Sequence, residues 1–300
     1  MFTGSIVALV TPFTEKGDLD YAALDGLVDF HLDQGSDALV VAGTTGESAT
    51  LAGREFRELL GAVIRRVEGA IPVLAGTGST STAKAVEQTR LAADLGADAA
   101  LVVTPYYNRP TQAGLEAHFT AIADASTIPV VLYNVPSRTA VDLLPVTVER
   151  LSAHPRIVGI KEAVRDPGRI DELLKRCGAA FTVLSGDDPS CLAALRSGAG
   201  GVVSVAANVA PALMHQLCAA AAARDWAGAT EIDRRLRPLF DMLALETNPI
   251  PVKWALFEMK RVGPEIRLPL TRLDEAHRRP VRQCLETLGF LGPEHERRMI

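Results

Sequence analysis

The sequence is poor in the residues from which metal centres and disulfide frameworks are built. Only four of its 300 residues are cysteines, widely spaced and without a CxxC pair: Cys177, Cys191, Cys218 and Cys284. We therefore expect free core thiols in a reducing compartment, the cytoplasm. The six histidines form no HExxH or other ligand spacing, so the sequence predicts no metal site.

Basic tracts and long apolar runs are also missing. A net charge of −5 without a Lys/Arg cluster argues against a nucleic-acid partner. No apolar run reaches the ~18 residues that a membrane span needs. The uncharged start MFTGSIVALVTPF has no basic residue before Lys16, so we expect a first strand rather than a signal peptide. No GxGxxG follows a strand, and GTGST at Gly76 is too short a match, so no cofactor is expected.

What the sequence does contain is a regular alternation of short apolar runs and helical stretches. The runs are continuous and rich in β-branched residues, as in strands that are covered on both faces. Several helical stretches end in a glycine suited to a left-handed cap: Gly35, Gly69, Gly96, Gly178 and Gly198. The predicted strands are Ile6–Val10, Ala38–Ala42, Ile71–Ala75, Ala99–Val103, Val130–Tyr133, Ile157–Lys161, Thr182–Ser185 and Gly201–Ser204. Eight strand–helix units predict a (β/α)8 TIM barrel.

The pattern changes after Pro211, where it becomes wholly helical. We expect residues 1–224 to form the barrel and residues 225–300 to form a C-terminal helical region. No low-complexity linker separates the two parts, so the helical region should pack on the barrel.

One lysine stands at the end of a strand that should be buried. Lys161 closes the apolar run in RIVGIKEA, and burial of an ammonium is costly unless it is paired or loses its proton. The other five lysines are predicted to lie in water, in polar loops or on periodic helical stretches: Lys16, Lys84, Lys175, Lys253 and Lys260. The alternative is that Lys161 merely emerges into solvent.

Polar segments gather at the carboxyl ends of the predicted strands, where TIM barrels carry their chemistry. GTTGES, TPYYNRP, YNVPSRT and SGDD follow four of these strands. Three of the four tyrosines fall on this rim: Tyr106, Tyr107 and Tyr133. Each feature also has a structural explanation, as a tight turn or as rim packing, but their combination with Lys161 favours catalysis.

These residues suit Schiff-base chemistry. A fully buried lysine can have its pKa lowered by ~3–5 units, and the neutral amine attacks carbonyl carbon. Tyr133, Tyr107 and Thr45 are candidates for a proton relay, because phenols and hydroxyls pass protons along short hydrogen bonds. Backbone N–H groups of GTTGES could bind a substrate carboxylate. Arg138 could bind a second carboxylate, unless it is simply a surface arginine.

Six segments occurring in order resemble the dihydrodipicolinate synthase family (4-hydroxy-tetrahydrodipicolinate synthases). They are GTTGES, VTPYYNRPTQAGL, YNVPSRTAVDL, GIKEA, SGDD and NPIPVKWAL, and the resemblance runs from the first strand to about Leu273. It implies a class I aldolase-type barrel that condenses pyruvate with L-aspartate 4-semialdehyde in the lysine and diaminopimelate pathway. It also implies a homotetramer built as a dimer of dimers.

The resemblance further implies roles for single residues. Lys161 would form the Schiff base and Tyr133 would be the adjacent acid/base. Thr45 and Tyr107 would complete the relay, with Tyr107 coming from a neighbouring subunit. The remaining substrate contacts would be Thr44 and Thr45 on the pyruvate carboxylate, Arg138 on the aldehyde's carboxylate, and backbone groups of Gly186 and Val203.

Two other functions remain open. An N-acetylneuraminate lyase or a 2-keto-3-deoxy sugar acid aldolase would share the lysine, the tyrosine and the GTTGES turn. Arg138, the threonine pair and Tyr107 favour the synthase, because a sugar aldehyde would be met by neutral donors. A barrel that only binds a keto acid, without catalysis, would normally have replaced Lys161 or Tyr133, and both are present.

Feedback inhibition by lysine, which the resemblance implies for many members, is not expected here. The corresponding region keeps Ser48, Ala49 and Tyr106. Where the resemblance places histidines, an amide and an acidic side chain, this chain has Gly53, Phe56, Thr80 and Lys84. A cation in place of an anion predicts insensitivity to millimolar lysine.

Overall fold

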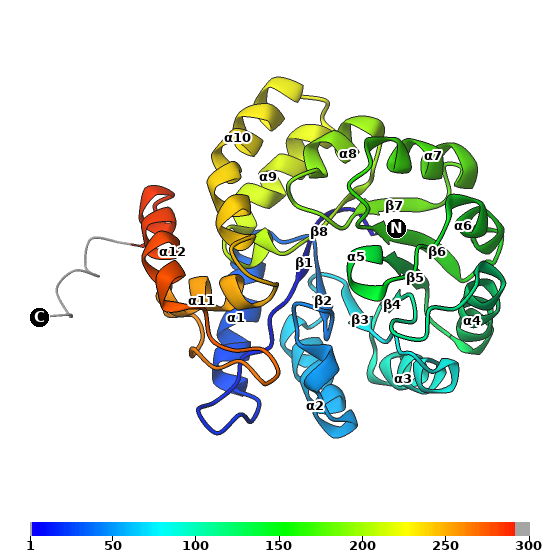
Figure 1. Ribbon diagram of the computed structural model, residues 1–300, viewed down its shortest axis with the longest axis horizontal. Coiled ribbons are helices and arrows are strands. Elements are labelled where there is room, and N and C mark those ends of the chain that lie inside the picture. Colours follow the sequence, from blue (N-terminus) through cyan, green and yellow to red (C-terminus); the bar gives the residue numbers. More distant parts are fainter. Residues whose placement is uncertain (1, 292–300) are drawn as a thin grey trace, which may run out of the picture.

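Eight parallel strands form one closed barrel in strict chain order, as the computed structural model shows for the residues it describes, 2–291 (Figure 1). The (β/α)8 prediction is therefore confirmed. The strands are β1 Gly4–Ala8, β2 Ala38–Val41, β3 Val73–Gly76, β4 Ala99–Val103, β5 Val130–Asn134, β6 Ile157–Glu162, β7 Thr182–Ser185 and β8 Gly201–Ser204.

Helices surround the strands in Figure 1. They are α1 Tyr21–Asp33, α2 Gly53–Val67, α3 Thr82–Leu95, α4 Gln112–Ala125, α5 Pro136–Thr139, α6 Pro145–Ser152, α7 Pro167–Cys177, α8 Cys191–Ser197, α9 Pro211–Ala222, α10 Trp226–Leu243, α11 Ile250–Glu258 and α12 Glu275–Thr287, with short 3-10 helices η1 Ser48–Thr50 and η2 Ala206–Asn208. The five glycines predicted to end helices all have positive φ, between 75° and 112°. An L-residue with a side chain is strained there, which is why glycine closes these helices.

Both faces of the strands are buried, which explains their unbroken apolar runs. Inward-facing residues such as Ile6, Leu74 and Val131 fill the barrel, in a cluster separate from the two that pack outward against the helices. At ~25 cal/mol per Å² of apolar surface, this double burial is the main stabilising contribution. An alternating pattern would have left one face in water.

Two strands begin at different residues from those predicted. β3 begins at Val73 rather than Ile71, because Pro72 has no N–H to give to a ladder. β1 is Gly4–Ala8 rather than Ile6–Val10, since the N–H of Val10 donates to the Asn208 side chain instead of a strand.

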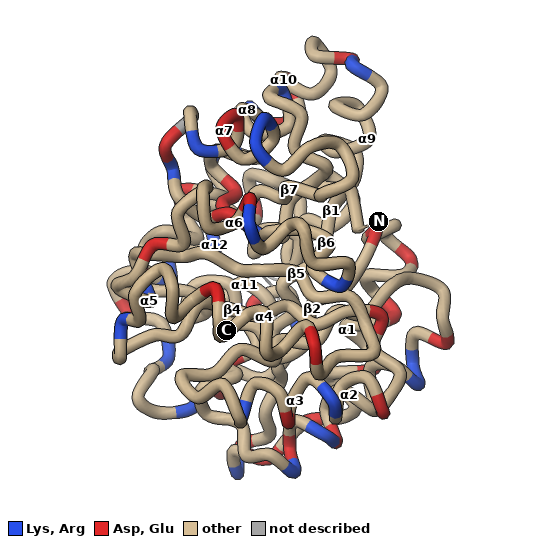
Figure 2. The backbone as a smooth tube through the Cα atoms, turned by 90° about the vertical axis from the view of Figure 1, so that its right-hand side faces the viewer, with Lys and Arg blue, Asp and Glu red and all other residues tan. Residues whose placement is uncertain are grey.

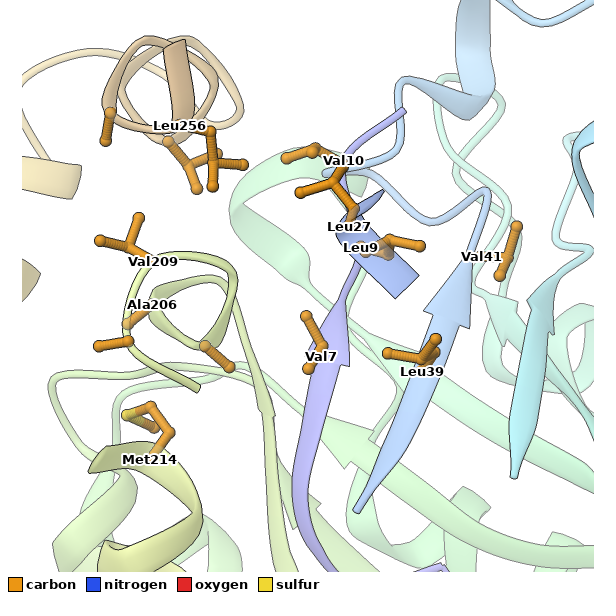
Figure 3. Close-up of a cluster of buried hydrophobic side chains, with 14 of the residues drawn as sticks. Val7, Leu9, Val10, Leu27, Leu39, Val41, Ala206, Val209, Met214 and Leu256 are labelled. Atoms are coloured by element: carbon orange, nitrogen blue, oxygen red, sulfur yellow. The ribbon is translucent and has the colours of Figure 1, made fainter. Parts of the chain in front are cut away.

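The C-terminal helices share a core with the barrel. One cluster joins Val7 and Val10 to residues of α10, α11 and α12, and Figure 3 shows part of it, with Leu256 of α11 near Val10 and Val209. The division of the chain at residue 225 stays a prediction, but α10 packs on α9, and α11 packs on η2.

Charged residues of both signs are mixed over the outer helices and loops (Figure 2). The four cysteines are free, two of them buried and two half-buried. Within residues 2–291, no helix combines the length and apolar character that a membrane crossing requires.

Candidate active site

A cavity of about 660 Å³ opens at the carboxyl end of the barrel. Six of the eight predicted site residues line it: Thr44, Thr45, Tyr133, Arg138, Lys161 and Gly186. They come from the ends of β2, β5, β6 and β7 and from α5, so residues up to 142 positions apart in the chain meet at one rim. The cavity is large enough for small organic acids, whose sites are concave pockets of comparable size.

Lys161 and Tyr133 are neighbours on paired strands. The register of β5 and β6 sets Tyr133 opposite Lys161, and the Lys161 Nζ lies 4.3 Å from the centre of the Tyr133 ring. Lys161 is only 6% exposed, yet its Nζ makes no hydrogen bond or ion pair with another described residue. An unpaired buried amine beside a cavity is available to a ligand.

Gly186 makes room for this lysine. A Cβ at position 186 would lie 3.1 Å from Cε of Lys161 and 3.0 Å from Cβ of Ala163, which is tighter than ordinary carbon contacts. The glycine therefore keeps the β7 end close to the lysine stem without crowding the amine.

The GTTGES turn presents two threonines to the cavity. Thr45 is 2% exposed, and its Oγ1 accepts a hydrogen bond of 3.0 Å from Asn248 Nδ2. The Thr11 hydroxyl donates to the Gly46 carbonyl and fixes the turn. The N–H groups of Thr44 and Thr45 donate to no other described residue, which leaves them for a carboxylate. The helix that follows is the single turn η1, so these N–H groups, rather than a helix dipole, would bind the anion.

Arg138 lies on α5 at the mouth of the cavity. Its Nη2 donates to the main-chain carbonyl of Asn248 at 3.4 Å, and no described carboxylate pairs with it. By contrast Arg165, which also lines the cavity, is already paired with Asp187 at 3.0 Å. Arg138 is therefore the arginine at the mouth of the cavity whose guanidinium is available to bind an anionic group of a ligand.

Tyr107 and Val203 lie elsewhere. Tyr107 is 93% exposed, has a φ of 71°, and does not line the cavity of its own chain. Val203 is 1% exposed in the barrel interior, and Val205 lines the cavity at that point of the rim. A single chain therefore brings together three of the four predicted catalytic groups at one cavity: the amine of Lys161, the phenol of Tyr133 and the hydroxyl of Thr45.

The prediction for Lys253 was wrong. This lysine was expected to lie in water, but it is 2% exposed, and its Nζ is paired with the buried Glu47 carboxylate. The second oxygen of Glu47 accepts the N–H of Arg267 at 3.0 Å. A signal existed in the sequence, because the residues around Lys253 on α11 are apolar on every side, as in a helix that is wholly buried.

A second polar network, also not predicted, supports the strand ends from outside the barrel. Glu162 follows Lys161 and accepts from the Asn134 Nδ2 (3.0 Å) and from the N–H of Val164 (2.9 Å). Asn134 also donates to Asp142, which pairs with Arg169. Burial raises the pKa of Glu162 to about 7 despite these donors. The network ties β5 to β6 directly behind Tyr133 and Lys161.

Asp188, in the SGDD segment, ties β7 to the end of β8. Its Oδ2 accepts from the N–H groups of Val205 (3.0 Å) and Ala206 (2.8 Å), and burial raises the pKa of this carboxyl. Within residues 2–291, no group of three His, Cys, Asp or Glu side chains is arranged to hold a metal ion. The groups that face the cavity suit acid–base and amine chemistry.

Comparisons with known proteins agree on one family. The model of the Dihydrodipicolinate synthetase family matches residues 1–288. A 4-hydroxy-tetrahydrodipicolinate synthase of Stutzerimonas stutzeri is 54% identical over 97% of this chain and 100% of that protein.

Two solved structures have nearly the same fold. The chloride-inhibited dihydrodipicolinate synthase of Acinetobacter baumannii, complexed with pyruvate, superimposes with a TM-score of 0.96 at 46% identity, covering 97% of this chain and 100% of that one. The enzyme of Cyanidioschyzon merolae with lysine bound gives 0.94 at 39% identity, covering 97% and 99%.

Proposed function

The chain belongs to the dihydrodipicolinate synthetase family, and from this premise we propose how its site works: as a 4-hydroxy-tetrahydrodipicolinate synthase that condenses pyruvate with L-aspartate 4-semialdehyde. The observation that carries the proposal is the unpaired Lys161 amine, buried beside Tyr133 in a cavity. The cavity-lining groups of this chain account for the steps without a cofactor.

The first half-reaction uses Lys161, Tyr133 and Thr45. The neutral Nζ adds to C2 of pyruvate, and loss of water from the adduct gives an iminium. The N–H groups of Thr44 and Thr45 hold the pyruvate carboxylate. The iminium draws electrons from C3, so a C3 proton leaves and an enamine forms. Tyr133 gives and takes the protons, since its ring lies against the amine.

The second half-reaction joins the two substrates. C3 of the enamine bonds to the aldehyde carbon, whose oxygen takes a proton from the relay. The amino group of the second substrate then attacks the iminium carbon, closes the ring and releases Lys161. Arg138, free of a carboxylate partner, binds the carboxylate of the semialdehyde. Backbone groups of Gly186 and of the Val203 segment complete the wall.

The same proposal extends to assembly and location. Tyr107 acts from a neighbouring subunit, and the subunits form a homotetramer as a dimer of dimers in the cytoplasm. An exposed tyrosine at the rim, outside the cavity of its own chain, supports this arrangement. Lysine does not regulate the enzyme, because Lys84, Gly53 and Phe56 replace the polar groups that would hold it.

Trapping of the Schiff base tests the proposal. Reduction with borohydride in the presence of pyruvate should add a three-carbon group to Lys161, as peptide mapping will show. Lys253 is the internal control, because it is also buried but lies in an ion pair. Aldehyde-dependent consumption of pyruvate is then assayed with the semialdehyde and with a sugar aldehyde that lacks a carboxylate. An unmodified Lys161, or preference for the sugar aldehyde, contradicts the proposal.

A further inference from the structure

The turn that follows β2 is bounded by two residues with a strained backbone. Ala42 and Glu47 both have a φ of 55°, in the left-handed region that favours glycine. Residues with a side chain persist in such conformations only where the surrounding structure fixes them. Between these two residues lie the N–H groups of Thr44 and Thr45, which donate to no other described residue. The shape in which the turn presents these groups must therefore be set by contacts from outside it.

Glu47 supplies such contacts through both oxygens of its carboxylate. The side chain is 1% exposed, and its Oε1 is paired with the Nζ of Lys253 on α11. Its Oε2 accepts the N–H of Arg267 at 3.0 Å. These partners lie 206 and 220 residues further along the chain. The end of the turn is therefore tied to the C-terminal region and not only to the barrel.

The two partners of Glu47 are themselves fixed, because both contact one aromatic ring. Phe13 follows β1 and is 2% exposed. The Lys253 Nζ lies 4.5 Å from the centre of its ring, and the Arg267 guanidinium carbon lies 4.2 Å from it. Arg267 also pairs with Glu55 of α2 and donates to the Thr50 carbonyl at 2.9 Å. This buried cluster of charges surrounds the turn from behind, and none of its members lines the cavity.

We propose that Glu47 and Lys253 are positioning residues for pyruvate: their ion pair holds the turn so that the N–H groups of Thr44 and Thr45 meet the substrate carboxylate. The inference rests on the proposed function and assigns to the C-terminal region a part in the affinity for the first substrate. The carboxylate is held in the same way before and during the reaction. Displacement of the turn should therefore weaken pyruvate binding and leave kcat nearly unchanged.

Lys253→Met removes the tie between the turn and α11. The pyruvate concentration that gives half-maximal borohydride trapping at Lys161 should rise roughly tenfold, the loss expected for about one hydrogen bond to a charged group. The KM for pyruvate should rise by the same factor, while kcat changes by less than about twofold. The variant also leaves the Glu47 carboxylate buried and unpaired, so its melting temperature should fall by ~5–10 °C. An unchanged affinity for pyruvate overturns the proposal.

Glu47→Gln combined with Lys253→Met separates a displaced turn from a weakened fold. The double variant lacks the same tie to α11, but it has no uncompensated buried charge, and its amide oxygen can still accept the N–H of Arg267. Neutral replacement of a buried ion pair is often nearly neutral for stability, so the melting temperature should return to within about 3 °C of the wild type. The half-saturating pyruvate concentration should stay raised roughly tenfold. Recovery of affinity together with stability overturns the proposal, because the pair would then only stabilise the fold.

Ile122→Ala is the matched control for stability. Ile122 is fully buried on α4, in a core cluster that contains no residue of the turn. The cavity left by the truncation should lower the melting temperature about as much as Lys253→Met does. The half-saturating pyruvate concentration should change by less than about twofold, because every tie of the turn is kept. A tenfold loss of affinity in this control would mean that any weakened fold binds pyruvate poorly, which overturns the proposal.

Failure of the proposal is distinct from failure of the proposed function. Trapping of pyruvate requires no semialdehyde, so the affinities of the variants are compared even if the wild type does not condense the two substrates. That result contradicts the proposed function alone. If the wild type condenses them and Lys253→Met keeps the wild-type affinity for pyruvate, only the positioning role fails. Absence of trapping in the wild type contradicts both.

Discussion

Two lysines of this protein are buried, and their surroundings differ in one respect. Both are nearly inaccessible, at 6% exposure for Lys161 and 2% for Lys253, and both Nζ atoms lie over an aromatic ring. Lys253 is paired with the Glu47 carboxylate, whereas Lys161 has no charged or hydrogen-bonding partner among the described residues. Burial lowers the pKa of Lys253, and Glu47 opposes that shift.

The difference teaches how to distinguish a structural lysine from a reactive one. Removal of either partner of a buried ion pair leaves the other charge buried and uncompensated, which is strongly destabilising. Such a pair therefore links the two elements that carry it. An unpaired amine at the wall of a cavity contributes little to the stability of the fold. The free energy that its burial costs is explained by its function rather than by stability. Lys253 links the turn after β2 to α11, and Lys161 faces the space in which a substrate would sit.

Exchange of each lysine for methionine gives the largest expected effects, and of opposite kinds. Lys161→Met should lower kcat by more than about 10³-fold, because the proposed nucleophile is lost, without loss of thermal stability. Lys253→Met leaves the Glu47 carboxylate buried and unpaired, which should cost ~3–5 kcal/mol of unfolding free energy. Denaturant titration and steady-state kinetics on the same preparations measure both.

Lys175→Met is the matched control, since Lys175 is exposed on α7 and should change neither quantity. If Lys161→Met were the less stable variant and Lys253→Met the catalytically dead one, with trapping at Lys253, the assignment of the two lysines would be reversed.

The relay should show a smaller loss, with a subunit pattern. Tyr133→Phe, Thr45→Val and Tyr107→Phe should each lower kcat by ~10²–10⁴-fold, more than they raise KM. Tyr107 lies outside the cavity of its own chain, so subunits carrying Tyr107→Phe and subunits carrying Lys161→Met should complement each other when mixed. Recovery of turnover in the mixed oligomer, absent from both parents, is the expected result. Failure of every mixture to recover would place Tyr107 outside the relay.

The barrel could be predicted because its signal is local. Each strand has four to six residues and is built around a short apolar run, and each predicted strand overlaps an observed one. The rim chemistry followed from topology, since the carboxyl ends of all eight strands meet at one edge. Lys161 and Tyr133 could therefore be brought together before their contact was known.

Contacts between distant segments could not be predicted. The contacts of Thr45 with Asn248 and of Glu47 with Lys253 each join residues more than 200 positions apart in the sequence. Neither segment contains a local pattern that indicates its partner. The segment NPIPVKWAL is part of the family resemblance, but Lys253 within it was predicted to be an ordinary lysine in water. The missing step was physical: a helix that is apolar all round has no face for a solvated ammonium.

Arg138→Ala should produce a loss confined to the second substrate. In the proposed mechanism the guanidinium meets only the semialdehyde, so kcat/KM for that substrate should fall by ~10–100-fold while trapping of pyruvate at Lys161 is nearly unchanged. Arg165→Ala is the matched control, because Arg165 lines the same cavity but is already paired with Asp187. Equal damage to pyruvate trapping and to semialdehyde use would place Arg138 at the pyruvate site or in the framework.

The smallest expected effect is that of free lysine on the rate. Gly53 has no side chain, so it offers no side-chain donor or acceptor to a ligand. Phe56 is turned into the core at 3% exposure. Lys84 is exposed on α3 and sets a positive charge where the ammonium of a ligand would need a negative one. We expect binding weaker than about 1 mM, less than ~4 kcal/mol of free energy, and hence an unchanged initial rate in a lysine titration. Lys84→Glu should make the enzyme more sensitive, and Lys175→Glu should not. Saturable inhibition of the wild type below about 1 mM would show that other residues have rebuilt the site around Tyr106.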